Sequence, residues 1–211
     1  MSGRSGAEEP WDQRLARRLV RPLAASPISP NHVTAFSLAT GLAAAVCYGL
    51  GGRGAHWGGL LIVVSMLADH ADGELARMSG RTSRFGHYFD YVSDGVVTVA
   101  LFVGIGVGLR GSALGWWAVP LGLAAGLTIA AIFLLRDEVW RRRGKEAIAQ
   151  PSWAGFEIQD VLYLVAPITW LGGLMPFLAA AGVGAPLFLL WQTWDVRRGE
   201  RRRAGGGRPV P

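Results

Sequence analysis

Long apolar stretches, separated by short polar or glycine-containing turns, make up most of the chain. A helix that crosses the ~30 Å hydrocarbon core of a bilayer needs about 20 mostly apolar residues. Six stretches approach or exceed this length, and we expect a transmembrane helix in each: residues 33–50, 56–78, 85–109, 112–135, 156–171 and 174–194. The second and third are the least apolar, because they contain acidic residues. The pattern therefore predicts an all-α, polytopic membrane protein with six transmembrane helices.

The segments on either side of these spans have patterns of their own. Trp11, Leu15 and Leu19 follow a helical spacing with arginines mostly opposite, which predicts a short amphipathic helix on the membrane surface. Pro22 is expected to end this helix. Arginine, glycine and proline dominate the end of the chain, as is typical of a disordered basic tail. The expected organisation is an N-terminal segment with the amphipathic helix (1–32), a six-span domain (33–195) and the disordered tail (196–211).

The basic residues predict the orientation of the spans. Of the 21 Lys and Arg, all but Arg53 and Arg110 lie near the two ends of the chain, in the second turn or after the fourth span. Because cytoplasmic loops of membrane proteins are enriched in Lys and Arg, we expect both termini to be cytoplasmic. The net charge of +6 then lies on the cytoplasmic rim beside anionic lipid headgroups, and not on a face that binds nucleic acid. Lys145 is the only lysine, which suggests a GC-rich, prokaryotic genome and hence a prokaryotic cell membrane.

Composition narrows the class of protein further. Hydrophobic residues make up 51% of the chain and charged residues 17%, which excludes an intrinsically disordered protein. Glycine accounts for 30 of the 211 residues, a frequency typical of helices that pack closely in membranes. Cys47 is the only cysteine, so neither an internal disulfide nor a cysteine metal cluster can form.

Four aspartates lie in the second and third predicted spans. Asp69 and Asp72 are three residues apart on one helix, and Asp90 and Asp94 are four apart on the next, so each pair shares a helix face. A charged side chain in the bilayer centre costs about 2.5–3.5 kcal/mol to insert and persists where it faces a cavity, the protein interior or a metal. Carboxylates at close range repel one another unless cations bind between them, and oxygen ligands select Mg²⁺ or Mn²⁺. The four aspartates therefore predict a site for two such ions.

Small residues and an arginine accompany these acids. Gly73, Ala76 and Gly86 leave space for a ligand, and the guanidinium of Arg77 suits phosphate oxygens. The pattern Asp-x2-Asp-Gly-x2-Ala-Arg-x8-Gly-x3-Asp-x3-Asp over residues 69–94 resembles the signature of the CDP-alcohol phosphotransferases (CDP-alcohol phosphatidyltransferases) at all eight specified positions. The six predicted spans, the amphipathic N-terminal helix and the Ser-Pro-Asn-His-Val-Thr stretch that enters the first span are also similar to that family.

The resemblance implies a reaction of phospholipid biosynthesis at the cytoplasmic side of the membrane. A hydroxyl of an acceptor alcohol attacks the phosphorus of a CDP-alcohol, and CMP leaves. By resemblance, the two metal ions are bound by Asp69, Asp72, Asp90 and Asp94, and Asp94 is also the general base. The CDP pocket would be lined by Gly73, Ala76, Arg77 and Gly86, with Asn31 and Thr34 near the nucleotide or its phosphates. The resemblance further implies a homodimer.

Several polar residues have two interpretations. Asn31 is either a nucleotide contact or a helix cap. Glu74 points either to the solvated rim or to a partner on another helix. His70 and His87 are expected to be bystanders in an oxygen-rich site. Three charged residues lie around the cytoplasmic ends of the fourth and fifth spans: Arg136, Glu157 and Asp160. They either take part in ion pairs with nearby arginines or bind the acceptor.

Functions from more than one class are compatible with these features. The favoured one is a transferase that uses CDP-diacylglycerol and a water-soluble polyol or polyol phosphate. A second candidate is a transferase whose CDP donor carries a polar headgroup and whose acceptor is a lipid alcohol. The signature is common to both kinds of transferase. A different class is a divalent-cation transporter, which needs acids distributed across the bilayer depth. The acids here gather near the cytoplasmic half of two spans, which disfavours transport. The intact acids also argue against a catalytically silent scaffold.

Overall fold

The computed structural model describes residues 17–18, 20–143 and 162–205, and within these ranges the regular elements are all helices. The longer helices are α2 (Pro30–Leu50), α3 (Arg53–Ser79), α4 (Arg84–Gly108), α5 (Ala118–Arg143) and α7 (Leu174–Gly205). Three short elements accompany them: η1 (Leu23–Ala25), η2 (Gly115–Trp117) and α6 (Val165–Trp170). The all-α fold class is therefore confirmed for the part of the chain that the structure describes.

Four helical segments are long and apolar enough to cross a membrane: Pro30–Leu50, Arg84–Gly108, Gly115–Leu135 and Leu174–Trp194. They correspond to four of the six predicted spans. The helix α3 has 27 residues, but its acidic half lowers its hydropathy. The fifth predicted span begins in residues outside the described ranges, and α6 accounts for six residues of it. Six spans therefore remain a prediction, as does the amphipathic helix, most of which lies outside the described residues.

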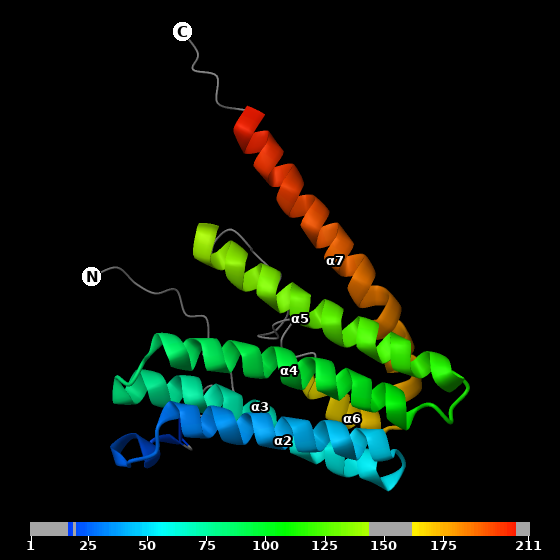
Figure 1. Cartoon of the computed structure of the whole chain (residues 1–211), viewed down its shortest axis with the longest axis horizontal. Helices are drawn as coiled ribbons and strands as arrows, with labels where there is room; N and C mark the ends of the chain where they lie inside the picture. The colour runs from blue at the N-terminus through cyan, green and yellow to red at the C-terminus, as the bar shows by residue number, and fades with distance from the viewer. Residues whose placement is uncertain (1–16, 19, 144–161, 206–211) are drawn as a thin grey trace.

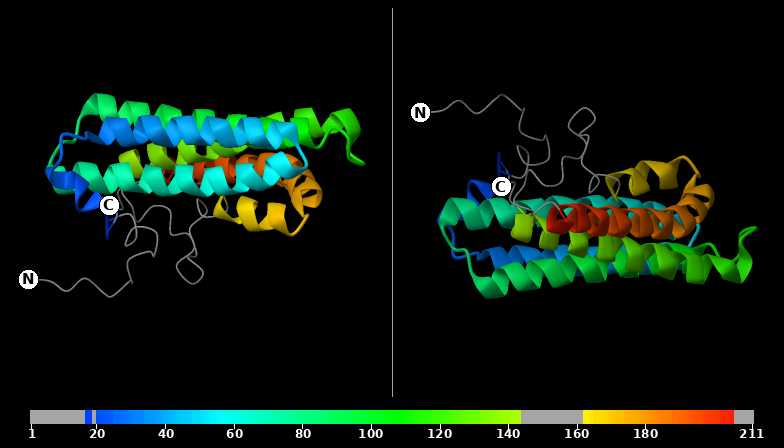
Figure 2. Two further views of the ribbon diagram at one scale, coloured as in Figure 1. Left: turned by 90° about the horizontal axis from the view of Figure 1, so that it is seen from below. Right: turned by 90° about the horizontal axis from the view of Figure 1, so that it is seen from above.

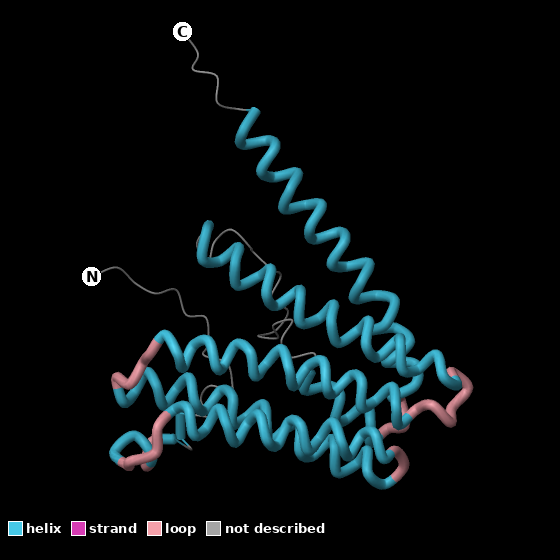
Figure 3. Tube along the Cα trace, in the orientation of Figure 1, coloured by secondary structure: helices cyan, strands magenta, loops and turns pink. Residues whose placement is uncertain are grey.

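The helices form a bundle in which α2 occupies the middle of the first layer. It packs against both α3 and α4, which have little direct contact with each other. The helix α5 packs on α4, and α7 packs on α5, while α6 lies against α3. Figures 1 and 2 show α2, α3 and α4 side by side in alternating directions, with α5 and α7 diverging from them toward the end of α7. The described loops lie at the two ends of the bundle (Figure 3).

Glycines allow α4 to approach its neighbours closely on two sides. A Cβ atom on Gly104 or Gly108 would overlap backbone carbonyls of α2, in the second case that of Tyr48. On the other side, a Cβ on Gly122 of α5 would overlap the Phe102 carbonyl of α4. Small residues at such crossings are the usual means by which membrane helices approach each other. The high glycine content therefore has a packing role at the centre of the bundle.

The larger of two buried apolar clusters extends from the middle of the bundle to the end opposite the acidic residues of α3 and α4. Its largest fully buried side chains include Tyr48, Phe102 and Ile105. The Tyr48 hydroxyl lies 2.8 Å from Thr169 Oγ1 and joins α2 to α6 by a buried hydrogen bond. Phe102 of α4 stacks on Phe177 of α7, with ring centroids 6.0 Å apart. These contacts hold α6 and α7 against the first layer at this end.

The turns follow the glycine pattern, with one difference. Gly51 and Gly52 have φ angles of 67° and 50°, values that favour glycine, and form the predicted turn between α2 and α3. The helix α5 begins at Ala118, although its span was predicted from residue 112. The reason is a local turn in which Ser112 Oγ accepts a hydrogen bond from the Leu114 amide and Gly115 adopts a φ of 54°.

The last helix also extends beyond its predicted end. The helix α7 continues to Gly205, so the backbone of residues 196–205, predicted to belong to a disordered tail, is helical. Residues 206–211 lie outside the described ranges.

Candidate functional site

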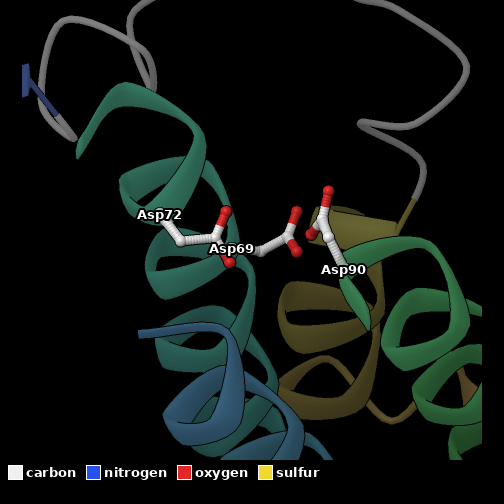
Figure 4. A group of neighbouring side chains, drawn as sticks. All are labelled: Asp69, Asp72 and Asp90. Carbon is white, nitrogen blue, oxygen red and sulfur yellow. The ribbon is translucent and has the colours of Figure 1, made fainter. Parts of the chain in front are cut away.

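Three of the predicted metal-binding aspartates converge from two helices. Asp69 and Asp72 come from α3 and Asp90 from α4, and each contributes a carboxylate oxygen to a group whose members all lie within 4.8 Å of one another. Figure 4 shows the three carboxylates turned toward a common space. The helical spacing of the acids therefore predicted their shared location correctly.

These carboxylates fit a divalent cation. Asp72 is only 4% exposed, and neighbouring carboxylates in such an environment repel one another unless positive charge is bound between them. The close group contains oxygen ligands alone, which favours hard cations such as Mg²⁺ over zinc. The three aspartates could therefore hold a metal ion, and the choice between Mg²⁺ and Mn²⁺ remains a prediction.

Asp94 lies one helical turn further along α4 and lines a cavity together with Asp69 and Asp90. The cavity has a volume of about 270 Å³ and lies between the acids and an apolar wall. Hydroxyl groups on α2, α3 and α4 line it, and the apolar wall includes residues of α5: Ser37, Ser65, Thr98, Ala130, Phe133 and Leu134. A cavity with carboxylates on one side and apolar side chains on the other can accommodate a ligand with both polar and apolar parts.

Hydroxyl groups hold α2 and α3 together beneath the acids. Thr34 Oγ1 is buried and donates a 2.5 Å hydrogen bond to Asp72 Oδ2. One turn deeper, Ser37 Oγ donates to the Ser65 carbonyl at 2.9 Å, and Ser65 Oγ donates to the Ser37 carbonyl at 2.8 Å. Thr34, which was predicted to lie near the nucleotide, thus contacts a carboxylate of the acidic group. Because these bonds are short and buried, they fix where Asp72 lies relative to α2.

Asn31 and Gly86 bring α2 and α4 together at the outer edge of the site. A Cβ on Gly86 would lie 2.9 Å from Asn31 Oδ1, so a larger residue at position 86 would displace the amide. Ser29 is the N-cap of α2, and Pro30 begins that helix, so the interpretation of Asn31 as a cap is wrong. The amide instead occupies the space between the N-terminal ends of the two helices.

The remaining motif residues continue along the end of α3. Gly73 faces the guanidinium of Arg77, since a Cβ built on it would lie 3.6 Å from Arg77 Nη1. Ala76 is half-buried on the same helix. Arg77 Nη2 donates a 2.6 Å hydrogen bond to Glu74 Oε1, and Glu74 is buried. The prediction that Glu74 points to the solvated rim is wrong, and its alternative, a partner outside its own helix, is right, because Arg17 Nε donates to Glu74 Oε2 at 3.3 Å.

Two histidines that the sequence suggested were bystanders lie on the cavity wall. His70 and His87 both line the cavity, and His70 Nδ1 lies 3.3 Å from the Tyr163 hydroxyl. Helical spacing contained a signal for His87, because it lies three residues before Asp90 and so shares its face. No corresponding signal existed for Tyr163, which is 93 residues from His70.

The predicted acceptor-binding residues remain predictions. Arg136 belongs to α5, but the description of that helix covers only its backbone at this position. Glu157 and Asp160 lie outside the described residues.

Comparison with known proteins finds one matching family and two named relatives. A model of the CDP-alcohol phosphatidyltransferase family matches residues 27–194. The chain is 34% identical over 98 residues to phosphatidylinositol phosphate synthase from Streptomyces avermitilis, a match covering 44% of this chain and 40% of the relative. It is 31% identical over 111 residues to phosphatidylinositol phosphate synthase from Mycobacteroides abscessus, covering 53% of this chain and 49% of the relative. The chain thus matches less than half the length of either relative, whereas the family model covers most of the chain. This protein belongs to the CDP-alcohol phosphatidyltransferase family.

Proposed function

We propose that the protein is an integral membrane transferase that joins CDP-diacylglycerol to a polyol phosphate and releases CMP. The observation that carries the proposal is the group of three aspartate oxygens within 4.8 Å of one another, beside a cavity, in a member of this family. Two relatives are named as phosphatidylinositol phosphate synthases, which supports a phosphorylated polyol of the inositol phosphate type as acceptor.

Each motif residue has a role in this proposal. Asp69, Asp72, Asp90 and Asp94 would hold two Mg²⁺ or Mn²⁺ ions. When bound, such ions neutralise phosphate charge and so favour attack on phosphorus. Arg77 binds donor phosphate oxygens, since its guanidinium offers several donors in a fixed plane. The small residues leave room for the donor's CDP group, and two polar residues of α2 contact or support its nucleotide end: Gly73, Ala76, Gly86, Asn31 and Thr34.

The reaction forms one bond to phosphorus and breaks another. The acceptor hydroxyl oxygen attacks the phosphorus that carries the diacylglycerol group, and the bond from that phosphorus to the oxygen of CMP breaks. The carboxylate of Asp94 accepts the proton of the attacking hydroxyl, which keeps the oxygen nucleophilic as the bond forms. CMP leaves with the electron pair of the broken bond, and Arg77 stabilises the negative charge that develops on it.

The membrane arrangement proposed for this reaction has six spans, with both termini and the active site on the cytoplasmic side of a prokaryotic membrane. Arginines concentrated on that side would attract an anionic acceptor. Arg136, Glu157 and Asp160 are the proposed acceptor-side residues. A homodimer is proposed from the family resemblance alone.

The decisive experiment is CMP release from CDP-diacylglycerol by detergent-purified protein. The assay would contain Mg²⁺ or Mn²⁺ and a panel of acceptors that includes inositol phosphate, glycerol phosphate and free inositol. We expect release with one polyol phosphate and a loss of at least about 100-fold in Asp94→Asn, because a general base contributes about 10²–10⁴-fold. Asp195→Asn, which removes an acid outside the motif, is the matched control and should retain activity.

The other outcomes distinguish the alternatives. Release only when the CDP carries a polar headgroup and the acceptor is a lipid alcohol would replace the proposed donor with the second candidate. Lack of release from every CDP-linked donor, together with Mg²⁺ or Mn²⁺ uptake into proteoliposomes, would favour the transporter.

A further inference from the structure

Glu74 is a buried carboxylate held between two arginines that are far apart in the sequence. Its Oε1 accepts the 2.6 Å hydrogen bond from Arg77, and its Oε2 accepts the 3.3 Å bond from Arg17. The Glu74 side chain is 4% exposed, whereas those of Arg17 and Arg77 are 51% and 62% exposed. A carboxylate with so little exposure is stable only when it is paired, so its two contacts differ from ordinary surface ion pairs.

A second set of contacts attaches the N-terminal segment to the same end of α3. Val20 is 1% exposed and belongs to a small apolar cluster with Ala71 and Leu75 of α3. Beyond α3, Arg81 Nη1 donates hydrogen bonds of 3.3 Å to the backbone carbonyls of Ser26 and Ile28. Apolar and polar contacts independent of Arg17 therefore hold residues 20–28 against this end of the helix. We call these residues, together with Arg17 and Arg18, the docked segment.

The residues of α3 that contact the docked segment are sequence neighbours of motif residues. Leu75 lies between Glu74 and Ala76 in the sequence, and Ala71 precedes Asp72. Arg17 occupies one oxygen of Glu74, which leaves the other for a single nitrogen of Arg77. Because a guanidinium has five N–H donors, Arg77 can keep this bond and still present the rest of its donors to a phosphate group beside Gly73.

We propose that Glu74 is a positioning residue for the donor site and that the docked segment controls it through Arg17. A long arginine side chain loses rotational freedom when it binds a phosphate, and the bond to Glu74 removes part of that freedom in advance. The N-terminal segment is then part of the donor-binding structure as well as a contact with the membrane surface. This inference rests on the proposed function, because it assigns the donor phosphates to Arg77.

The test compares two neighbouring arginines. Arg17→Ala removes the contact with Glu74, and Arg18→Ala removes the same charge from an exposed position in the same segment. At saturating acceptor, we expect Arg17→Ala to raise the KM for CDP-diacylglycerol about tenfold, the size expected for one charge-assisted hydrogen bond. Its kcat should change by less than about twofold, since the carboxylates are untouched. Arg18→Ala should match the wild type, and Arg17→Lys should recover part of the affinity.

Glu74→Gln keeps the volume of the side chain and removes its charge. We expect its KM to rise at least as much as that of Arg17→Ala, and we expect the double variant to be no worse than Glu74→Gln alone, because the two residues act through one contact. The wild type, Arg17→Ala, Glu74→Gln and the double variant form a double-mutant cycle. Thermal unfolding of these four proteins measures the coupling of the two residues in stability and identifies any variant that fails to fold.

Several results would overturn the inference. Equal KM changes in Arg17→Ala and Arg18→Ala would assign the effect to general surface charge. A change in kcat with unchanged KM would remove the role in donor binding, and additive effects in the double variant would separate the two residues. If the wild type released no CMP from any donor, the proposed function would fail. Direct binding of CDP would then decide the inference, and equal CDP affinities in the wild type and Arg17→Ala would reject it.

Discussion

Thr34 illustrates how a single hydroxyl supports the acidic group from the neighbouring helix. Its hydrogen bond to Asp72 satisfies one oxygen of a carboxylate that is almost fully buried. A bond of this kind fixes the orientation of a metal-binding side chain without touching the metal. The arrangement places a residue at the start of α2 in direct contact with the motif on α3 and α4.

Thr34→Val removes this hydroxyl and keeps the branched shape of the side chain. We expect the activity at low Mg²⁺ to fall about 10–100-fold and a higher Mg²⁺ concentration to restore part of it, because supporting partners of metal ligands contribute in this range. A Mg²⁺ titration of CMP release measures the effect. Thr40→Val is the matched control, since the Thr40 hydroxyl donates to backbone carbonyls of its own helix. A shift of equal size in both variants would contradict the role of Thr34.

At the level of the helices, close backbone approach is the main constraint on α4. Its glycines face α2 on one side, and glycines of α5 face it on the other. Each crossing depends on the absence of a side chain, so a methyl group has very different effects at different positions along the same helix.

Gly108→Ala should destabilise the protein by about 1–3 kcal/mol, the usual size of an overpacking effect, because the new methyl group would overlap the Tyr48 carbonyl. Gly95→Ala is the matched control on α4, since nothing lies within 4 Å of a Cβ built there. Its stability should stay within about 1 kcal/mol of the wild type, the range of helix propensity. Thermal unfolding in detergent compares the two, and similar unfolding temperatures would show that α2 and α4 can separate easily.

The helices also illustrate what sequence can predict. The spans at 33–50 and 85–109 agree with α2 and α4 to within a few residues, because glycine or proline marks several of their ends. The start of α5 was misplaced, since residues 112–117 contain no charged residue and only the hydrogen bonds of Ser112 and the conformation of Gly115 define a turn. The acidic site followed from helical periodicity. The contact of Glu74 with Arg17 did not, because the two residues are 57 positions apart and no local pattern connects them.

For the molecule as a whole, the convergence of acids would make folding and metal binding linked processes. Carboxylates from α3 and α4 repel one another across the site, and a bound cation would remove that repulsion. Any ligand that binds only the folded state stabilises it in proportion to the logarithm of its concentration.

Removing divalent cations with EDTA should therefore lower the unfolding temperature, and Mg²⁺ or Mn²⁺ should restore it. For a chain of this size we expect roughly 2–4 °C for each kcal/mol of stabilisation. Differential scanning fluorimetry in detergent measures the shift, and Asp90→Asn should reduce it. A shift of the same size in Asp90→Asn would assign the cation to another part of the protein.

The position of α2 between α3 and α4 has a consequence for ion choice. Gly41 of α2 faces both neighbours, because a Cβ on it would lie 2.6 Å from the Val97 side chain of α4 and 2.8 Å from Ser65 Oγ of α3. Because Ser65 and Val97 line the cavity beside the acids, we expect a larger residue at position 41 to move α3 and α4 apart there. Mg²⁺ requires short, nearly ideal coordination, whereas larger cations tolerate longer and less regular ligand distances.

Gly41→Ala should therefore raise the activity with Mn²⁺ relative to that with Mg²⁺. Gly49→Ala is the matched control, because a Cβ built there makes only ordinary contacts of 3.8 Å or more, and it should leave this ratio unchanged. Rates of CMP release with Mn²⁺ and with Mg²⁺ give this activity ratio. An unaltered ratio in Gly41→Ala would mean that the positions of the acids on α3 and α4 do not depend on α2. If the ratio changes, α2 acts as a spacer between α3 and α4, and the preference of the site for its ion would depend on a residue that does not belong to the acidic group.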